Sequence, residues 1–442
     1  MPHTLSIVAL AFLSRGVALA PPQDTLVIAD VTVLPMTGPR AIEHQTVTIA
    51  GGRIVSMRTA GGARPSAGVR VIDGRGKFLL PGLVDMHVHL STPDELPMYV
   101  GNGVLTVRDL NGSPETLAWR DAVAKGSIFG PRLFVSGPMI SGADIPWRNK
   151  VTPTTAAAAE SVVVAQKAAG YDLVKIYDGI SKPVFDAAIA AARRLGMPST
   201  GHIPESVGFD GVLASGMTGL EHLDKTVFAV NGHELDTLKI PGIVARIKAA
   251  GVWVTPTLES MVQLYLVSSG GYDSLLARPE ARDAPAPLRD FWTSVTVRLA
   301  GRRPRLADAP CNAWCAYQLR LAGALAAARV PLLAGTDLPN AVLVPGFSLH
   351  RELAVLVQAG LTPYQALEAA TSAPARFFRQ AADWGTVAVG QRADLLLADG
   401  NPLTDLSVLS QPAGVVLRGR WYGADELARM RRALVPSPAG GR

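Results

Sequence analysis

The amino-acid sequence predicts an α/β protein: a (β/α)8 TIM barrel at residues 77–383, with a small composite β-sandwich domain formed by residues 21–76 and 384–442. Two observations support this prediction. Both ends of the chain are rich in short β-branched segments, whereas the middle alternates short apolar segments with helical patterns rich in alanine and leucine. Such alternation is typical of βαβ units around a parallel sheet.

The two β-rich ends contain segments of strand length bounded by turn residues. They are Thr25–Pro35, Gln45–Met57 and Val69–Asp73 near the N-terminus, and Gly385–Asp399 and Val415–Tyr422 near the C-terminus. Gly51 and Gly52 favour a tight hairpin inside the second segment, because glycine accepts the positive φ that such turns need. Two β-rich ends around a different middle indicate one small domain assembled from both termini.

The middle of the chain contains eight apolar segments of strand length, the number of strands in a (β/α)8 barrel. They are Phe78–Met86, Val104–Asp109, Arg132–Ser136, Leu173–Tyr177, Ser199–His202, Gly219–Leu223, Val252–Pro256 and Leu332–Asp337. Helical patterns separate them, notably at Thr155–Ala169, Pro183–Leu195, Gly242–Ala250 and Ala316–Ala328. The Pro- and Arg-rich stretch Leu258–Ala313 interrupts the alternation, and long insertions of this kind often form a lid or a substrate wall.

Composition narrows the classes of function. The 442 residues carry a formal net charge of +6, and the one dense basic stretch, Arg298–Arg305, has no interleaved aromatic residues. We therefore interpret this stretch, which includes Arg302, as a solvated face and expect no nucleic-acid partner. The two cysteines, Cys311 and Cys315, lack the second pair that a tetrahedral metal site needs, so we expect buried or free thiols.

The first 20 residues resemble a signal peptide. Leu5–Leu13 is apolar, and Ala18-Leu19-Ala20 offers small residues at the spacing that signal peptidase reads. A periplasmic or secreted protein is therefore expected. However, no Lys or Arg precedes the apolar run, and Arg15 follows it. The alternative is therefore a cytoplasmic protein with a disordered leader. No other run is long and apolar enough for a bilayer, so we expect no membrane span in the mature protein.

Metal-ligating residue types lie at the ends of the expected strands. His87 and His89 are two positions apart at the end of the first strand, so both imidazoles point to the same side and can reach one ion. Lys175, His202, His222 and Asp337 lie at the ends of the fourth, fifth, sixth and eighth strands. In a barrel these ends meet at the catalytic face, so the sequence predicts one metal site there.

At these residues the sequence resembles the amidohydrolase superfamily, in particular its imidazolonepropionase-like and prolidase-like metal-dependent hydrolases. The similar segments are Pro81–Leu90, Tyr171–Gly179, Gly201–Pro204, Gly219–Leu223, Leu333–Asp337, Pro345–Pro363 and Gly385–Gly419. The resemblance covers nearly the whole chain after the first 20 residues. It implies a barrel with a composite β-sandwich and a metal set of His87, His89, Lys175, His202, His222 and Asp337.

The resemblance implies two divalent metal ions, for which zinc suits the mixed imidazole and oxygen ligands. A lysine desolvated at the barrel mouth can react with carbon dioxide, so we expect Lys175 to be a carbamate that bridges both ions. The alternative is an ion-pairing lysine in the barrel core. His87, His89 and Asp337 would hold one ion and His202 and His222 the other. Asp337 would pass a proton from the bridging hydroxide to the leaving amine.

Other residues are weaker candidates for the site. Tyr177 lies two residues after Lys175 and is expected either to polarise the substrate carbonyl or to be a core or rim tyrosine. Arg108 and Asp109 are interpreted as a structural pair at the barrel top, with substrate binding as the alternative. His350 and Glu352 are expected to brace the loop after Asp337. His233 and Arg302 are expected at the surface, with pocket lining as the alternative.

The expected reaction is hydrolysis of an amide or peptide-like C–N bond in a small substrate, such as a dipeptide or an N-acyl amino acid, by a metal-bridging hydroxide. Hydrolysis of a lactone or a phosphotriester at the same site is the alternative, because the fold does not fix the substrate. Imidazolone ring opening and a non-catalytic barrel scaffold fit the intact ligand set less well. The sequence leaves the exact substrate, the native metal and a homo-oligomeric state open.

Overall fold

The computed structural model describes residues 25–61, 69–145, 149–232, 234–268, 270–282, 284, 288–294, 313–340 and 342–432. The predicted signal peptide at residues 1–20 lies outside this part of the chain, and so do His233, Arg302 and Cys311. Export therefore stays a prediction. Cys315 is buried, as expected.

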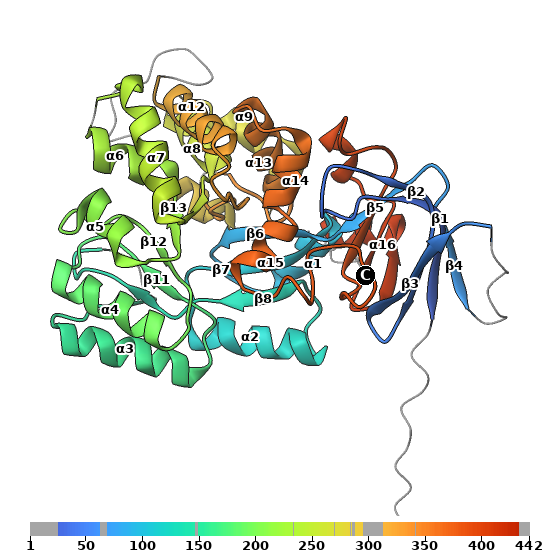
Figure 1. Ribbon diagram of the computed structural model, residues 1–442, viewed down its shortest axis with the longest axis horizontal. Helices are drawn as coiled ribbons and strands as arrows, with labels where there is room; N and C mark the ends of the chain where they lie inside the picture. The colour runs from blue at the N-terminus through green and yellow to red at the C-terminus, as the bar shows by residue number, and fades with distance from the viewer. Residues whose placement is uncertain are drawn as a thin grey trace, which may run out of the picture.

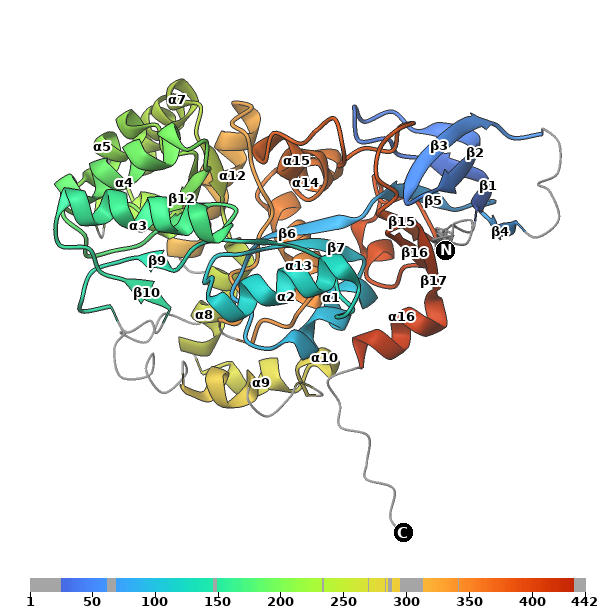
Figure 2. The ribbon, with the colours of Figure 1, turned by 90° about the horizontal axis from the view of Figure 1, so that it is seen from below.

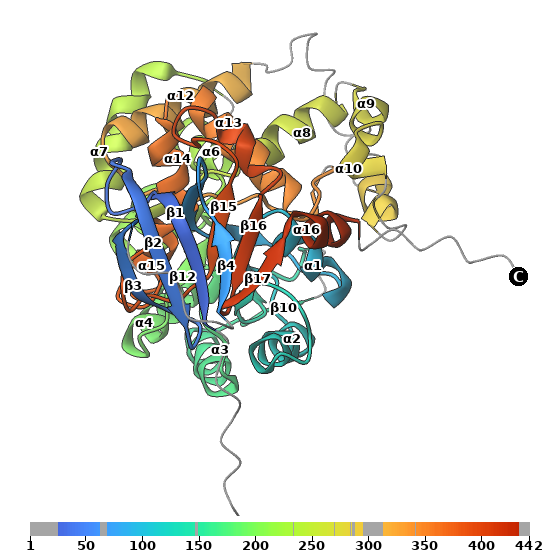
Figure 3. The same ribbon diagram turned by 90° about the vertical axis from the view of Figure 1, so that its right-hand side faces the viewer.

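Strands from both ends of the chain form one eight-stranded sheet (Figures 1 and 3). Its strands are β1 (Leu26–Val33), β2 (Ile42–Ala50), β3 (Arg53–Thr59), β4 (Arg70–Asp73), β5 (Phe78–Pro81), β15 (Leu395–Ala398), β16 (Gly414–Leu417) and β17 (Arg420–Gly423). The order is β17-β16-β15-β5-β1-β2-β3, and β4 also pairs with β1. Strands from the two ends of the chain thus lie in the same sheet. The described strands are connected as a single sheet that divides at β1, rather than as two separate sheets of a sandwich.

A division at Gly82 corrects the first predicted barrel strand. The sequence predicts one strand over Phe78–Met86, but the structure places β5 in the terminal sheet and β6 (Leu83–Val88) in a parallel sheet. The Gly82 amide donates to the Asp394 carbonyl at 2.9 Å, and a Cβ atom at Gly82 would lie 2.5 Å from the Leu105 side chain. Only a residue without a side chain therefore fits where the chain passes from one sheet to the other.

The middle of the chain forms two parallel sheets. One has the order β6-β7-β8, with β7 at Val104–Asp109 and β8 at Arg132–Val135. The other has the order β10-β9-β11-β12-β13-β14. Its strands are β9 (Met139–Ile140), β10 (Lys150–Val151), β11 (Val174–Ile176), β12 (Ser199–Gly201), β13 (Gly219–Glu221) and β14 (Trp253–Thr255).

The eighth predicted strand, Leu332–Asp337, is not a regular strand in the structure. This segment makes single parallel bridges, from Leu332 to Val254 on one side and from Leu338 to Val88 on the other. A third bridge, Ser136 to Leu173, connects the two parallel sheets. The described residues therefore form mixed α/β sheets joined by bridges rather than an unbroken eight-stranded ladder. Asp337 has a φ of 64°, which a β-strand cannot contain.

Helices cover the outside of the parallel sheets (Figures 1 and 2). They are α1 (Leu96–Gly101), α2 (Pro114–Lys125), α3 (Ala156–Ala169), α4 (Lys182–Arg194), α5 (Gly208–Ser215), α6 (Leu223–Asn231), α7 (Ile240–Ala250), α12 (Ala313–Ala327), α13 (Phe347–Gln358), α14 (Pro363–Ala369) and α15 (Ser372–Phe377). Helix α16 (Ala424–Arg431) follows the terminal sheet, and short 3₁₀ turns occupy Pro93–Glu95, Thr237–Lys239 and Leu406–Leu409.

Local sequence explains where the predicted helices begin and end. Helix α3 begins after Thr155, whose hydroxyl accepts from the Ala158 amide, and ends at Gly170, which has a φ of 89°. An N-terminal threonine cap and a left-handed glycine are the usual helix boundaries. Helix α4 buries Phe185 and Ile189, four residues apart on the face that packs toward the sheet.

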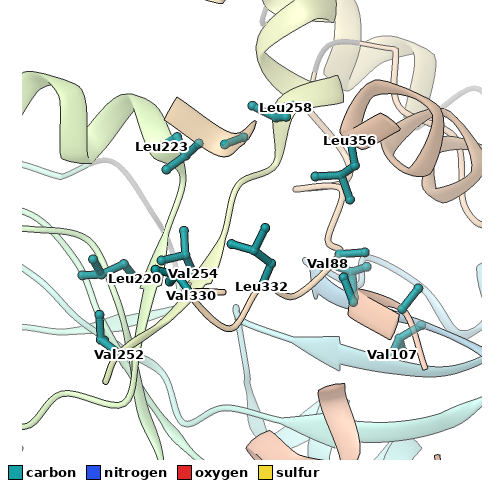
Figure 4. Packing of buried hydrophobic residues seen from close by; sticks show 14 of the residues in the cluster. Val88, Val107, Leu220, Leu223, Val252, Val254, Leu258, Val330, Leu332 and Leu356 are labelled. Carbon is teal, nitrogen blue, oxygen red and sulfur yellow. The ribbon is translucent and has the colours of Figure 1, made fainter. Parts of the chain in front are cut away.

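A continuous apolar core connects the parallel sheets with the segment after residue 330. Figure 4 shows Leu332 between Val254 of β14 and Val88 of β6. All three side chains are buried in the same hydrophobic cluster. The segment that bears Asp337 is therefore held in place by apolar packing as well as by its bridges.

The long predicted insertion Leu258–Ala313 is partly helical. The structure describes α8 (Leu258–Ser268), α9 (Tyr272–Leu276) and α10 (Pro279–Arg282) within it. The Trp292 side chain is buried, and its indole N–H donates to the Pro339 carbonyl at 2.9 Å, two residues after Asp337. Within the described ranges, no helix has both the length and the hydrophobicity needed to cross a bilayer.

Candidate metal centre

The six predicted metal ligands meet at the carboxyl ends of the parallel strands. His87 lies in β6 and Lys175 in β11. His89, His202 and His222 directly follow β6, β12 and β13, and Asp337 lies in the segment that is bridged to the strands on both sides. All six side chains are buried. This end of a parallel barrel-type sheet is where catalytic groups of such folds lie.

Asp337 lies at the centre of the imidazoles. Its Oδ1 atom is 3.1 Å from His89 Nε2 and 3.3 Å from His87 Nε2, and its Oδ2 atom is 3.8 Å from His222 Nδ1. Candidate ligand atoms of His87, His222 and Asp337 all lie within 4.8 Å of one another, so one ion can contact the three. Asp337 and His222 also have positive φ angles, of 64° and 63°. Such strained non-glycine residues are concentrated at functional sites.

His202 and Tyr177 extend the cluster on the side of β11 and β12. The His202 ring centroid is 5.1 Å from that of His222 and 4.1 Å from that of Tyr177. The structure thus brings Tyr177 beside the predicted ligands, as its spacing from Lys175 suggested. Its role toward a substrate stays a prediction.

Three buried polar atoms show that the residues suit a metal. Within the described part of the chain, His87 Nε2, His202 Nε2 and Lys175 Nζ have no hydrogen-bond partner. Buried polar atoms without partners are rare in folded proteins, because each forfeits its hydration. Imidazole nitrogens left in this state beside a carboxylate are ready to ligate a divalent cation.

Neighbouring side chains orient the imidazoles through Nδ1. His87 Nδ1 is 2.7 Å from Glu221 Oε2, and His222 Nδ1 is 2.8 Å from the Thr257 hydroxyl. The Thr257 hydroxyl donates to the Pro256 carbonyl, so its oxygen accepts from His222. His202 Nδ1 is 3.0 Å from Asp178 Oδ2. A proton fixed on Nδ1 leaves each Nε2 atom with a lone pair for a metal.

Burial keeps the imidazoles neutral. It lowers the pKa of His202 to about 4 and holds the pKa values of His87 and His222 well below the ordinary value. Burial alone would raise the pKa of Asp337, but His222, His89 and Lys175 outweigh it and hold this pKa below its usual range. The set therefore offers neutral nitrogens and an ionised carboxylate near neutral pH, the protonation states that metal binding requires.

Lys175 has an unusual environment for an amine. Its side chain is fully buried, and burial lowers its pKa to about 8, although the carboxylates of Glu221 and Asp337 oppose the shift. A lysine with a pKa near 8 is partly a neutral amine at neutral pH. Such an amine can react with carbon dioxide, whereas an ammonium group cannot.

Five of the six predicted ligands, all except His87, line a cavity of about 150 Å³ at the mouth of the parallel sheets. Its wall includes Tyr177, Lys225 and Asn340, and also Met261 and Leu264 of α8. The insertion after β14 therefore contributes to the wall of the cavity, and its role toward a substrate stays a prediction.

The structure changes the interpretation of Arg108 and Asp109. Arg108 is fully buried and donates to Glu221 Oε1 at 2.6 Å instead of pairing with Asp109. The Asp109 carboxylate accepts from the backbone amides of Asn111 and Leu90. Arg108 thus has a structural role, which is the interpretation that the sequence favoured. It acts beneath the site, where it holds the Glu221 carboxylate that orients His87. Both residues lie outside the lining of the metal cavity.

Among the described residues, the hydrogen bonds of His350 and Glu352 go to segments other than the loop after Asp337. His350 Nε2 lies 2.9 Å from the Asn102 carbonyl at the end of α1. The Glu352 carboxylate accepts from the backbone amides of Leu258 and Glu259, at 3.2 and 2.7 Å. Glu352 thus holds the chain where it leaves β14 for α8, the helix whose side chains reach the metal cavity.

Sequence reasoning missed the residues that hold the ligands. Glu221, Asp178 and Thr257 each contact a different histidine, and Asn340 donates to Asp337 Oδ2 at 2.5 Å. Glu221 adjoins His222 in the sequence yet contacts His87 from another strand. No spacing rule predicts such a contact, because it depends on which strands are neighbours.

Comparison with known proteins agrees with this geometry. The family model described as "Amidohydrolase family" matches residues 78–422, which is most of the chain and contains every predicted ligand. The chain belongs to the amidohydrolase family. The predicted resemblance is therefore confirmed, and the family implies a TIM barrel with an additional domain.

Individual relatives of this amidohydrolase are distant. Adenine deaminase 3 of Rhizobium johnstonii is 27% identical over 257 residues, which cover 54% of this chain and 39% of that protein. The chain thus matches well under half the length of this relative. Among solved structures, bottromycin amidohydrolase has a TM-score of 0.73 at 24% identity, with 93% of this chain and 90% of the other covered. A Xaa-Pro dipeptidase with bound methionine has a TM-score of 0.67 at 20% identity, with 90% and 100% covered. These likenesses show the fold.

Proposed function

We propose that this protein is a metal-dependent hydrolase that cleaves an amide or peptide-like C–N bond in a small substrate. The observation that carries the proposal is the cluster of candidate ligand atoms from His87, His222 and Asp337, within 4.8 Å of one another. The buried amine of Lys175 lines the same cavity. Membership of the amidohydrolase family supports hydrolysis of C–N bonds as the class of reaction.

Two divalent ions, zinc by the chemistry of the donors, are the proposed cofactors. His87, His89 and Asp337 would hold one, and His202 and His222 the other, with a carbamate on Lys175 between them. The Nε2 atoms of His87 and His202 and the Nζ atom of Lys175, none of which makes a hydrogen bond, support this assignment. When bound, such a pair of ions lowers the pKa of a shared water and polarises the scissile carbonyl.

Asp337 is the proposed general base and acid of the reaction. Its pKa lies below the usual range, so the carboxylate is ionised and able to take a proton from the attacking water. Asn340 donates to Oδ2, while Oδ1 faces the imidazoles of His87 and His89. A carboxylate held in this way can pass the same proton to the leaving amine. Tyr177, in the same cavity wall, is the proposed donor to the substrate carbonyl.

We also infer that the two parallel sheets and the segment 331–338 form one (β/α)8 ring. Backbone hydrogen bonds support this inference on both sides of the segment. The Leu333 amide donates to the Val254 carbonyl at 2.9 Å, and the Asp337 amide donates to the His87 carbonyl at 2.8 Å. Ring closure explains why ligands from distant parts of the chain share one cavity.

The test is a metal analysis combined with a substrate panel. Protein expressed with zinc and bicarbonate is expected to contain two metal ions per chain and to hydrolyse dipeptides or N-acyl amino acids. The same protein after chelation is the control and should be inactive until metal is restored. Activity restricted to lactones or phosphotriesters would show that the enzyme cleaves an ester bond rather than a C–N bond. If protein expressed with zinc and bicarbonate contains no divalent metal, the proposed hydrolase function is contradicted and a non-catalytic scaffold is favoured.

A further inference from the structure

A groove of about 1060 Å³ lies beside the metal cavity. Its lining comes from the loops after β11 and β12 and from the first turns of α6, so it opens at the same end of the strands as the metal ligands. In Figure 1 the helices α4, α5 and α6, which follow these strands, lie together on the side away from the terminal sheet. The groove is thus part of the catalytic face.

The metal cavity by itself is small for a substrate. Its volume is about 150 Å³, whereas ligand sites in proteins usually measure roughly 300–1,000 Å³. Two ions and a water molecule would also take up part of that space. Most of an amide substrate must therefore lie outside the cavity, and the adjoining groove offers the volume that the cavity lacks.

Lys225 forms the wall between the two spaces, because it lines both of them. It lies in the first turn of α6, three residues after His222, and its ammonium is 3.2 Å from Asp178 Oδ2. About a third of the Lys225 side chain is exposed. Part of the partition is therefore a partly exposed side chain, over which a ligand can extend from one space to the other.

The groove presents apolar side chains to solvent. Phe228 is 40% exposed, and one side of its ring packs against Trp314, with 4.6 Å between centroids. Ala229, also on α6, is exposed as well, whereas Ile180 and Ile203 line the groove with side chains that are largely buried. Ligand sites are concave and mostly apolar, so Phe228 and Ala229 within this groove suit the apolar part of a ligand. The lining also includes the charged residues Asp178, Glu205 and Lys225.

We propose that this groove is a second substrate subsite, which holds the apolar distal part of an amide substrate longer than a dipeptide. The proposal rests on the proposed function, because it assigns the groove to the substrate of the same metal site. It changes the expected substrate class from dipeptides to amides with an extended apolar chain. An octyl chain has the right chemistry for a probe, and it can be attached on either side of the scissile bond.

The experiment compares three amides: N-acetylglycine, N-octanoylglycine and N-octylacetamide. The zinc-loaded native enzyme is expected to show a kcat/KM at least about tenfold higher for one of the octyl amides than for N-acetylglycine, since each buried methylene group contributes to binding. The octyl amide with the higher kcat/KM shows whether the acyl side or the amine side of the substrate lies in the groove.

The variant Ala229→Trp fills the groove from α6 without touching a predicted ligand. It should abolish the chain-length preference and leave metal content and melting temperature unchanged. Ala157→Trp is the matched control, because Ala157 is also an exposed alanine, on α3, and does not line the groove. It should keep the native preference.

Binding to the metal-free protein separates this proposal from the proposed function. Calorimetry is expected to show tighter binding of the preferred octyl amide than of N-acetylglycine, and Ala229→Trp should remove the difference. Selective binding without any hydrolysis by the zinc-loaded protein would support the groove and contradict the hydrolase. Equal binding and equal kcat/KM for short and long amides would overturn the groove proposal, but would not contradict the proposed hydrolase function.

Discussion

Asp178 Oδ2 lies 3.0 Å from Nδ1 of His202, and the same oxygen accepts from Lys225 at 3.2 Å. One carboxylate therefore joins a predicted metal ligand to the side chain that separates the metal cavity from the groove. The His202 side of this contact is deeply buried, whereas the Lys225 side reaches solvent. Carboxylates in this position usually fix the tautomer and the orientation of a ligating histidine.

The variant Asp178→Asn should weaken binding of the second metal ion by about 10–100-fold, because an amide orients the imidazole less strongly than a carboxylate. Metal titration of the variant, followed by cobalt absorption spectra, measures this effect independently of activity. One ion should stay tightly bound by His87, His89 and Asp337. Asp186→Asn, which breaks only the exposed pair with Lys182, is the control. Unchanged affinity for both ions would show that Asp178 does not position His202.

Carboxylation of Lys175 should become faster as the pH rises from 7 to 9 at constant dissolved carbon dioxide. The pKa of the buried amine is about 8, below the ordinary 10.5, so the neutral amine that reacts increases roughly tenfold over this range. Mass spectrometry under conditions that preserve carbamates can follow incorporation of labelled carbon dioxide in the presence of zinc. Lys175→Met should incorporate no label at the site. A rate independent of pH would mean that the amine is not the reacting group.

The same pKa predicts the pH dependence of stability in the metal-free, unmodified protein. The folded-state pKa lies below the unfolded value, so the folded protein holds fewer protons than the unfolded chain between pH 8 and 10.5. The free energy of unfolding should therefore rise with pH in this window. Urea unfolding at several pH values measures the slope, and Lys175→Met should reduce it. An identical slope in the variant would assign the effect to other groups.

The variant Asp337→Asn should keep the fold and lose turnover. An amide cannot accept the proton of the attacking water, so we expect kcat to fall by about 10²–10⁴-fold. Asn340→Ala is the companion variant, because it removes the contact to Asp337 Oδ2 and leaves the carboxylate in place. It should lose less activity. An Asp337→Asn enzyme with bound metals and native kcat would refute the proposed role of Asp337.

Removal of the buried guanidinium in Arg108→Met should destabilise the protein by about 3–5 kcal/mol, because it leaves the Glu221 carboxylate buried without its main partner. Urea unfolding of metal-free protein measures this difference. The double variant Arg108→Met with Glu221→Gln should recover part of the lost stability, since no unpaired charge remains. It should still bind metal more weakly, because His87 Nδ1 loses its carboxylate partner. If the single variant is as stable as the native protein, the Arg108–Glu221 pair contributes nothing to the free energy of unfolding.

The sequence by itself determined the α/β class, the β-rich unit built from both termini and most of the helices. Hydrophobic periodicity and helix boundaries such as Thr155 and Gly170 are local, so they can be read along the chain. The positions of His87, His89 and Asp337 at strand ends, with the family resemblance, also pointed to the metal site before its geometry was known.

Only the tertiary structure decided which residues meet across the strands. Arg108 is found with Glu221 rather than with its neighbour Asp109, and Glu352 holds the start of α8 rather than the loop after Asp337. Asp178 and Thr257 emerge as partners of His202 and His222. The physical reason is common to all of these contacts. Each joins side chains brought together by strand order and burial, and neither strand order nor the depth of a side chain is encoded in the spacing of residues along the chain.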